Sequence, residues 1–575
     1  MRNDSPSAQA EDNQDRDNHD CNVQDPAVNS PSSSLSRRSF LSCVGASTAV
    51  AAAATVAFPS PLLGQNIEGL SEVSGHGNGP SRREQSYQIR VKAAIAEHKI
   101  HTPPHINNGD EASYPNFIGN YSQGLPHNSI GEVDPSAYQA LLTAVNSGDP
   151  ADFANIPLGG ALKLLDPQGG LAFDLEGTDC GQLAIPPAPK LASAERAGEM
   201  VENYWMALSR DIPFSQYGNE SITAAAIADL NNLSNFKGPK VNGQVTGGTL
   251  FRGSTPGDLI GPYMSQFFLQ PLHLGALSVT QKYDTYAPNT DYLTDFASWL
   301  AVQNGTPTAP PAVVGTSYIS NGRELGSWDR VDLPFQAYLF AAQWMLGRVP
   351  LNPGNPYLTI ANQAGLQTFG GPYILDLLGE VANRALKAEW YQKWFVHRTL
   401  RPMAYGGLVH NKITGVANYP INHEVLNSAA VQAVFSKNGT YLLPTAYPEG
   451  GPLIPSYAGG HSAVAGACAT ALKAFFNESF VIPNPVVASD DGQSLLPYTG
   501  SDAGLITVGG EINKVASNVA QGRNIASLHY RSDALHGLLL GEQITISVLR
   551  DQRSTYTEPF SGFTFTKFDG TMVTV

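Results

Sequence analysis

The chain has 575 residues, of which 42% are hydrophobic and 14% charged, so it holds enough apolar material for a sizeable folded core. Its formal net charge of −15 argues against nucleic acid or an anionic membrane as partner, because no basic stripe offsets the repulsion. Basic clusters within so acidic a chain predict a local anion site.

Residues 1–57 are predicted to form a leader with a twin-arginine export signal. Residues 1–33 are polar and rich in Asp, Asn and Ser, which is typical of disorder. Arg37 and Arg38 then precede a small apolar run that ends at Ala57, a pattern typical of this export route. The plainer alternative is a basic dipeptide beside an alanine-rich tether. The run is too short and too rich in alanine for a membrane span. From the export signal we therefore expect delivery to the periplasm or the cell exterior.

The four cysteines do not predict a disulfide framework. Cys21 and Cys43 lie in the leader, which leaves Cys180 and Cys468 in the mature chain. Cys468 stands in a helical run of small residues, where a buried free thiol is expected.

After a Gly/Ser/Asn-rich linker at residues 58–84, residues 85–575 are predicted to form one all-α domain with long Gly/Pro-rich loops. Apolar residues recur every three or four positions in several segments, which indicates amphipathic helices. Pro135 stands in the first turn of one of them, a position that proline favours. The predicted helices span residues 85–98, 134–146, 195–208, 222–233, 292–302, 333–346 and 374–400.

The last of these helices carries the first basic cluster. Pro402 disfavours the helical conformation for Arg401, so the helix is predicted to end there, with Lys393 about two turns earlier on a neighbouring face. Lysines and arginines on a helix are usually solvated. These two, however, are set among aromatic residues that include Trp390, and cations in apolar surroundings need an anion.

The second cluster is Gly459-Gly460-His461, at the start of a run of small residues that predicts a closely packed helix. Two glycines let backbone N–H groups approach an anion, and the helix dipole favours negative charge there. His461 is placed to exchange protons with a ligand of the same anion. On its own, this tripeptide is weak evidence for a functional site.

The third cluster contains Arg523, His529 and Asp533. The four-residue spacing of His529 and Asp533 puts them on one helical face, so that Asp533 can orient the hydrogen bonds of this site. His536 extends the face, which leaves open a divalent-metal site of the form His-x3-Asp-x2-His. In that case the three cations of the clusters would lack an anion.

Taken together, Lys393-x7-Arg401-Pro402, Gly460-His461 and Arg523-x5-His529-x3-Asp533 resemble the motifs of the vanadium-dependent haloperoxidases, relatives of a class of acid phosphatases. The resemblance covers most of the chain after the leader. Residues 124–134, 210–214, 251–258 and 529–533 look like the red-algal and cyanobacterial bromoperoxidase branch. The resemblance to this family implies an all-α fold with two four-helix bundles, and assembly as a homo-oligomer.

The resemblance also implies a cofactor, vanadate, and three reactants: hydrogen peroxide, a halide and a small organic acceptor. His529 would be the axial nitrogen ligand of vanadium, and His461 the acid–base residue. Vanadium would act as a Lewis acid without redox cycling, and the halide, bromide or chloride, would leave as hypohalous acid. A structural calcium ion in one of the loops is left open. The residues expected to hold vanadate oxygens are Lys393, Arg401, Gly459, Gly460 and Arg523.

Two positions depart from the family pattern. Gly459 replaces the usual serine, which removes a hydrogen bond to a charged group worth roughly 1.5 to 3 kcal/mol and weakens cofactor binding about tenfold or more. Ile454 replaces a histidine that the bromoperoxidase branch commonly has seven residues before His461. Trp390 and Ile454 would then form an apolar halide pocket of the kind that chloride-capable members have.

Two other functions remain open at the level of the sequence. An acid phosphatase fits because phosphate and vanadate are isosteric, and His529 would then be the nucleophile. An envelope protein that sequesters oxyanions is favoured slightly by Gly459. His397, His410 and His423 are expected to be ordinary hydrogen-bonding residues rather than ligands.

Overall fold

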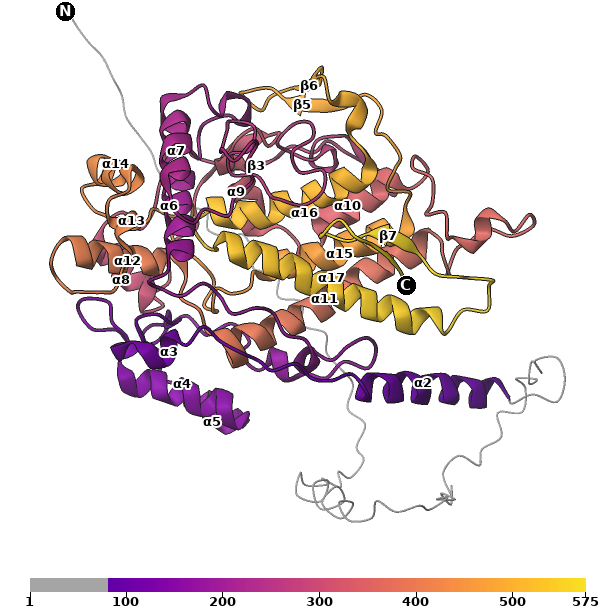
Figure 1. Ribbon diagram of the computed structural model, residues 1–575, viewed down its shortest axis with the longest axis horizontal. Coiled ribbons are helices and arrows are strands. Elements are labelled where there is room, and N and C mark those ends of the chain that lie inside the picture. The colour runs from indigo at the N-terminus through magenta and orange to yellow at the C-terminus, as the bar shows by residue number, and fades with distance from the viewer. Residues whose placement is uncertain (1–80) are drawn as a thin grey trace, which may run out of the picture. The chain divides into compact units, whose positions relative to one another are not determined.

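The computed structural model describes residues 81–575 (Figure 1). The chain divides into two units, and the described residues belong to the second, Asn78–Val575. The predicted leader and nearly all of the predicted linker lie outside the described residues. The first described helix, α2 (Arg82–His98), is capped by the Ser81 hydroxyl and has no buried residue, so the last three residues assigned to the linker are helical.

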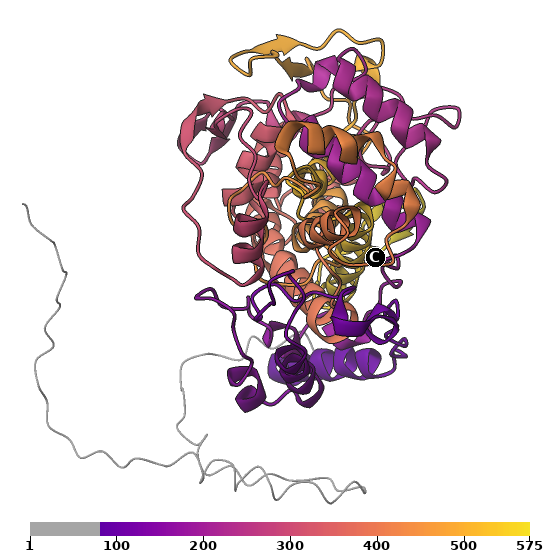
Figure 2. The same ribbon diagram turned by 90° about the vertical axis from the view of Figure 1, so that its left-hand side faces the viewer.

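The centre of the second unit is a helical bundle around α15 (Gly460–Phe475). The helices α11 (Gly371–Tyr391), α16 (Val508–Ile525) and α17 (Arg531–Arg553) pack against it, and Figure 1 shows all four side by side. Figure 2 views this bundle nearly end-on, with other helices around it. Every residue of α15 except His461 is buried, because small side chains on all its faces let neighbours approach. The expected all-α fold is confirmed.

Glycines bring α15 and α17 into backbone contact. A Cβ at Gly466 would lie 2.0 Å from the carbonyl oxygen of Leu538, and one at Gly541 would lie 2.0 Å from that of Ala463. No other residue fits at these positions without moving the helices apart. The N-termini of α15 and α17 therefore lie side by side.

A second group of helices packs around α6 (Ala194–Leu208). Its other members are α7 (Ser221–Asn232), α13 (His423–Leu426) and α14 (Ala429–Asn438). Two more helices connect to the bundle: α9 (Gly322–Val331) contacts α16, and α10 (Gln336–Met345) contacts α11 and α15. The remaining helices are α3 (Asp110–Ser113), α4 (Pro135–Ser147), α5 (Pro150–Ala154), α8 (Phe296–Gln303) and α12 (Pro402–Ile413).

Among residues 81–575, the strands form four two-stranded antiparallel sheets, and α8 lies in the chain between the two strands of one of them, β3 and β4. Their pairs are β1 (Leu272–Leu274) with β2 (Leu277–Val279), β3 (Tyr283–Tyr286) with β4 (Val313–Ser317), β5 (Val486–Ala488) with β6 (Leu495–Pro497), and β7 (Thr564–Thr566) with β8 (Met572–Thr574). None carries a residue of the predicted site.

Most predicted helices begin and end within a few residues of the observed ones, but the prediction for residues 374–400 is wrong in its last part. The helix α11 ends at Tyr391 and continues as a π-helical segment, Gln392–His397. Arg398 ends this segment with a left-handed φ of 40°. Pro402 does not stop a helix; it begins α12, at the first helical position that proline favours.

The two cations of the first basic cluster therefore lie on different elements from the single helix that was predicted. Lys393 lies in the π-helical segment, and Arg401 is the N-cap residue of α12. The two cations therefore reach the site from separate elements. π-helical turns are frequent at functional sites, because the extra residue per turn redirects side chains.

Cys468 is a buried free thiol, as predicted, and Cys180 is also buried and free. Burial raises the pKa of the Cys180 thiol to about 12, which keeps it unreactive. Within residues 81–575, no helix combines the length and the hydrophobicity needed to cross a membrane.

Candidate active site

The three basic clusters meet beside the paired N-termini of α15 and α17. The amide of Gly459 donates to the carbonyl of Asp533 (3.0 Å), which joins the second cluster to the third. The Arg401 guanidinium lies 3.4 Å from His529 Nε2, which joins the first cluster to the third. Lys393, Arg401, Arg523 and His529 are all buried. The convergence of segments far apart in the chain is as the sequence predicted.

His529 is held by one nitrogen and leaves the other available. It lies in the link between α16 and α17 rather than on a helix, and Asp533 reaches back to it from the first turn of α17. Its Nδ1 is 2.8 Å from Asp533 Oδ2. Burial holds the pKa of His529 well below its usual value, and the charges of Arg401 and Lys393 lower it further. The ring is thus neutral, with Nδ1–H donating, and its Nε2 lone pair faces only the long 3.4 Å contact with Arg401 Nη1, which a ligand can replace.

Asp533 is itself fixed by further donors. Its Oδ2 accepts from the Ser456 hydroxyl (2.5 Å) and the Tyr530 amide (3.2 Å). Burial opposes ionisation, but the hydrogen bond from His529 holds the pKa of Asp533 below its usual value. The carboxylate therefore stays charged and orients the imidazole.

Arg401 has one unsatisfied donor at the centre of the site. Its Nε donates to the carbonyl of Ile454 and its Nη1 to that of Leu528, each at 2.9 Å. Its Nη2 is buried without a partner. Burial lowers the pKa of Arg401 to about 10, so the guanidinium remains charged at neutral pH. A buried charge with a free donor marks a place for an anion.

Lys393 is more fully occupied than the sequence suggested. Its Nζ donates to the carbonyls of Pro455 (2.7 Å), Ser456 (2.6 Å) and Ala458, and lies 3.1 Å from the carboxylate of Glu389. Burial lowers the pKa of Lys393 to about 8, while the Glu389 charge opposes this. Lys393 thus supports the loop before α15 as well as adding positive charge.

The third cation and the second histidine are joined by two aspartates that sequence reasoning missed. Arg523 Nη1 donates to the Asp329 carbonyl (2.9 Å), and its Nε lies 3.7 Å from Asp329 Oδ2. His461 Nε2 is 2.9 Å from Asp332 Oδ1 and 3.8 Å from Asp329 Oδ1. Burial raises the pKa of Asp329 to about 7, against the charges of Arg523 and His461.

The only hint of these aspartates in the sequence is their three-residue spacing. Asp332 is 129 residues from its partner His461, so no local pattern links the two. Both come from α9 and its C-cap, a helix that was not predicted.

The start of α15 provides a backbone cradle. Gly459 is the N-cap of α15 and Gly460 its first residue, so the amides of the first turn have no partner within the helix. A Cβ at Gly460 would lie 3.2 Å from the Trp390 ring, which makes glycine the residue that fits closely there. An anion at this end would be favoured by both the amides and the helix dipole.

The two residues of the predicted halide pocket belong to one apolar cluster. Ile454 is buried in it together with Trp394 and Tyr121, and the partly exposed Trp390 packs against its edge. The surroundings are therefore apolar, as expected from a histidine replaced by isoleucine.

His397, His410 and His536 belong to no group of three potential metal ligands among residues 81–575. His397 is buried at a 4.8 Å ring contact with Tyr457, and burial lowers its pKa to about 3. The expectation that it makes hydrogen bonds is wrong, because neither ring nitrogen has a partner. His410 Nδ1 accepts from the Tyr441 amide. His536 lies 5.8 Å from the Tyr457 ring. Among residues 81–575, the group of three potential metal ligands is instead Asp329, Asp332 and His461.

The donor set fits a tetrahedral or trigonal-bipyramidal oxyanion. Free donors are the buried Arg401 Nη2 and Arg523 Nε, and the open His529 Nε2 suits a metal centre within that anion. The α15 amides add hydrogen bonds without charge. Guanidinium groups and backbone amides are the groups that proteins use for such oxygens.

The chain is similar over most of its length to proteins of one family. The vanadium-dependent bromoperoxidase of Corallina officinalis is 35% identical over an alignment 598 positions long, which covers 87% of this chain and 99% of the relative. That of Ascophyllum nodosum is 36% identical over 522 residues, covering 86% and 92%. The solved homohexameric second vanadate-dependent bromoperoxidase of Ascophyllum nodosum has a TM-score of 0.84 and 31% identity, covering 89% of this chain and 93% of that one. No family model matches the chain.

Proposed function

The chain belongs to the vanadium-dependent bromoperoxidases, and from this premise we propose that it oxidises halide with hydrogen peroxide to hypohalous acid, which halogenates small organic acceptors. In the overall reaction, hydrogen peroxide, halide and one proton give hypohalous acid and water. The observation that carries the proposal is a neutral, oriented imidazole at His529 among buried cations with free donors. The family relationship favours this reaction over phosphate-ester hydrolysis.

We assign the residues that hold the cofactor by their donor and ligand atoms that are available to an anion. Vanadate, when bound, supplies a Lewis-acidic centre that activates peroxide. His529 Nε2, with the ring oriented by Asp533, would bind the vanadium. Arg401 Nη2, Arg523 Nε and the Gly460 amide would donate to the oxygens of vanadate. Lys393, which donates to three carbonyl groups, would contribute positive charge.

His461 is proposed to carry the proton. Asp332 accepts at Nε2 and fixes the ring, which leaves Nδ1 as the nitrogen that can take a proton. We therefore assign proton transfer from hydrogen peroxide to His461 Nδ1. Asp329, buried between Arg523 and His461, couples the charge of the cation to that of the imidazole.

The halide is proposed to be bromide or chloride. The apolar surroundings of Trp390 and Ile454 strip water from the halide and add no charge. Comparing initial rates with each halide at equal peroxide concentration tests this assignment.

Three further assignments concern the whole protein. We infer export by the twin-arginine route to the periplasm or exterior, supported by Arg37 and Arg38 and testable by cell fractionation with Arg38→Lys. Assembly as a homo-oligomer is supported by the homohexameric relative. A structural calcium ion is proposed for one of the long loops; elemental analysis of purified protein checks it.

Replacing the proposed axial ligand tests the site directly. His529→Ala is expected to lose saturable vanadate binding in equilibrium dialysis and at least a thousandfold in bromide-dependent peroxide consumption, because it removes the imidazole nitrogen that lies beside the Arg401 guanidinium. His423→Ala, on the short helix α13, is the matched control and keeps both. Unchanged vanadate binding by a folded His529→Ala protein would remove this assignment.

A further inference from the structure

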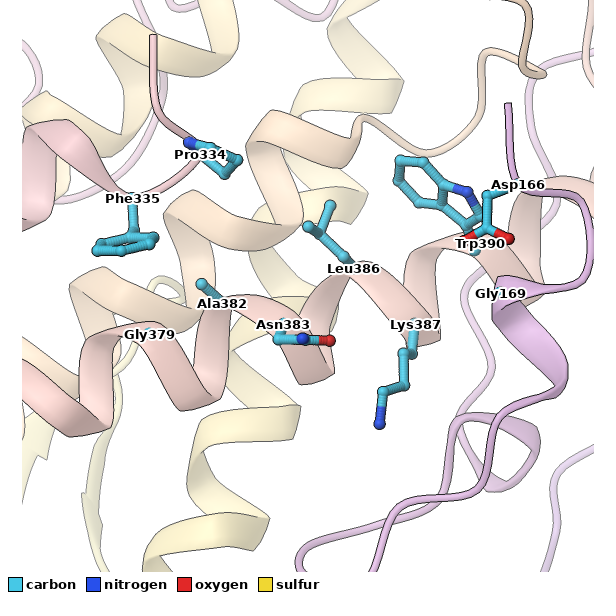
Figure 3. Close-up of a pocket in the computed structure, with 10 residues that line it drawn as sticks. All are labelled: Asp166, Gly169, Pro334, Phe335, Gly379, Ala382, Asn383, Leu386, Lys387 and Trp390. Carbon is cyan, nitrogen blue, oxygen red and sulfur yellow. The ribbon is translucent and has the colours of Figure 1, made fainter. Parts of the chain in front are cut away.

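A pocket of about 360 Å³ lies between α11 and the loop that follows α9 (Figure 3). One row of α11 side chains forms its floor, at the three- and four-residue spacing of a helix face. Pro334 and Phe335 line it from the loop, and Asp166 and Gly169 line it near Trp390. The α11 residues of the row are Gly379, Ala382, Asn383, Leu386, Lys387 and Trp390.

The pocket shares two walls with the proposed active site. A Cβ at Gly460 would lie 3.2 Å from Trp390 and 3.7 Å from Leu386, so both side chains stand against the start of α15. On the other wall, Phe335 follows three residues after Asp332, which holds His461. The His461 side chain is 27% exposed, whereas the cations behind it are buried. The site therefore opens on the side where the pocket lies.

The walls suit a flat, apolar molecule. Phe335, Leu386, Ala382 and the indole of Trp390 supply aromatic and aliphatic surface, and Figure 3 shows Leu386 and Trp390 on the same side of α11. Aromatic rings bind to such walls through area burial and edge or offset contacts.

The polar groups of the pocket are few and favour a neutral molecule that can accept a hydrogen bond. The Lys387 ammonium is paired with Asp174 and points away from the Trp390 ring in Figure 3, so it offers no free charge to an anion. Asp166 further disfavours an anion. The Trp390 Nε1 donor has no partner but is buried, so the exposed Asn383 carboxamide in the same row is the neutral donor available to a ligand.

We propose that this pocket binds the organic acceptor, an uncharged, electron-rich aromatic or heteroaromatic ring of about the size of indole, and that halogen is transferred while the ring is held there. The inference rests on the proposed function. In the transfer, a ring carbon donates its electron pair to the halogen of hypohalous acid and the oxygen–halogen bond breaks. The proton lost from that carbon joins the departing hydroxide to form water.

Filling the pocket tests the inference without touching the catalytic groups. A Cβ at Gly379 would meet no atom within 4 Å, so Gly379→Phe can place a ring in the pocket with no backbone clash. Gly379→Ala is the matched control that leaves the space open. For each protein loaded with vanadate, we would measure kcat/KM for indole and for a small hydrophilic β-diketone, and indole binding by equilibrium dialysis without peroxide.

The expected result separates the two acceptors. In Gly379→Phe, kcat/KM for indole falls at least tenfold and saturable indole binding is lost, while kcat/KM for the diketone stays within twofold; Gly379→Ala matches the unaltered protein in all three. Equal rates with indole in all proteins, or no saturable indole binding by the unaltered protein, would overturn the pocket assignment while diketone turnover persists. Absence of bromide-dependent turnover of the diketone in the unaltered protein would instead contradict the proposed function.

Discussion

At the scale of single residues, the site depends on which nitrogen and oxygen atoms are already occupied. Asp533 occupies one ring nitrogen of His529. Carbonyl groups accept from the Lys393 ammonium and from two donors of Arg401. The four-residue spacing of His529 and Asp533 pointed to neighbouring side chains, but the predicted shared helical face is wrong, because His529 lies in the link before α17. The occupancy of Lys393 was not predictable, because its acceptors are main-chain carbonyls of a loop whose path the sequence does not encode locally.

Gly459 is one of the two positions at which the sequence is expected to depart from the family pattern, and this departure can be reversed. A Cβ there would lie 2.7 Å from Ser462 Oγ, the end of a rotatable side chain, at an ordinary φ of −81°. Gly459→Ser is therefore expected to fold and to lower the dissociation constant of vanadate about tenfold or more, by adding one hydrogen bond to a charged group. Isothermal titration with vanadate measures it. Gly459→Ala adds the Cβ alone; an equal gain in that variant would exclude the hydroxyl as the cause.

At the scale of elements, the π-helical segment and the α15–α17 contact determine where the ligating groups stand. The periodicity of residues 374–400 predicted one helix because it reports which face is buried and not how many residues form each turn. Pro402 signalled a boundary correctly, but the next helix begins there rather than the previous one ending. The small residues of α15 predicted close packing, and the structure confirms it.

The α15–α17 contact should be sensitive to one methyl group. Gly541→Ala places a Cβ 2.0 Å from the Ala463 carbonyl oxygen, so the helices must separate, and we expect the free energy of unfolding to fall by about 1 to 3 kcal/mol. Gly379→Ala, in the open on α11, is expected to raise it by about 0.5 to 1 kcal/mol through helix propensity. Urea unfolding of both variants measures the difference. Equal midpoints for the two would show that the contact is not tight.

A carboxylate pair beside α11 predicts a pH-dependent stability. Arg384 lies 3.5 Å from Glu176 and 2.8 Å from Glu380. Burial, and then the Glu380 charge, raises the pKa of Glu176 from 4.5 to about 7. The folded state therefore binds more protons than the unfolded state between these values, and its stability falls as pH rises through them.

Glu176→Gln removes this loss. We expect the variant to be more stable than the unaltered protein above pH 7 by about 1 kcal/mol, a value reduced for solvent screening because Glu176 is 30% exposed. Below pH 4.5 the two should be alike. Thermal melts across pH 4 to 9 check this, and parallel curves for the two proteins would show that Glu176 titrates normally.

At the scale of the whole molecule, the sequence predicted an all-α domain with one basic cavity because its helices are amphipathic and its cations cluster in short motifs. It did not predict α9 or the aspartates at its end, since their role appears only when segments 129 residues apart meet. The pocket beside α11 was hidden for the same reason: Phe335 and Leu386 become neighbours only through the packing of the loop on the bundle.

The proposed halide oxidation depends on a cavity that activates peroxide only when vanadate fills it. The most direct measurement is bromide-dependent peroxide consumption by apo-protein titrated with vanadate, with phosphate as competitor and hydrolysis of a phosphate ester followed in parallel. We predict no halide oxidation without vanadate, saturable activation by vanadate, and reversal by phosphate. Phosphate-ester hydrolysis by the apo-protein with no halide oxidation at any vanadate concentration would contradict the account.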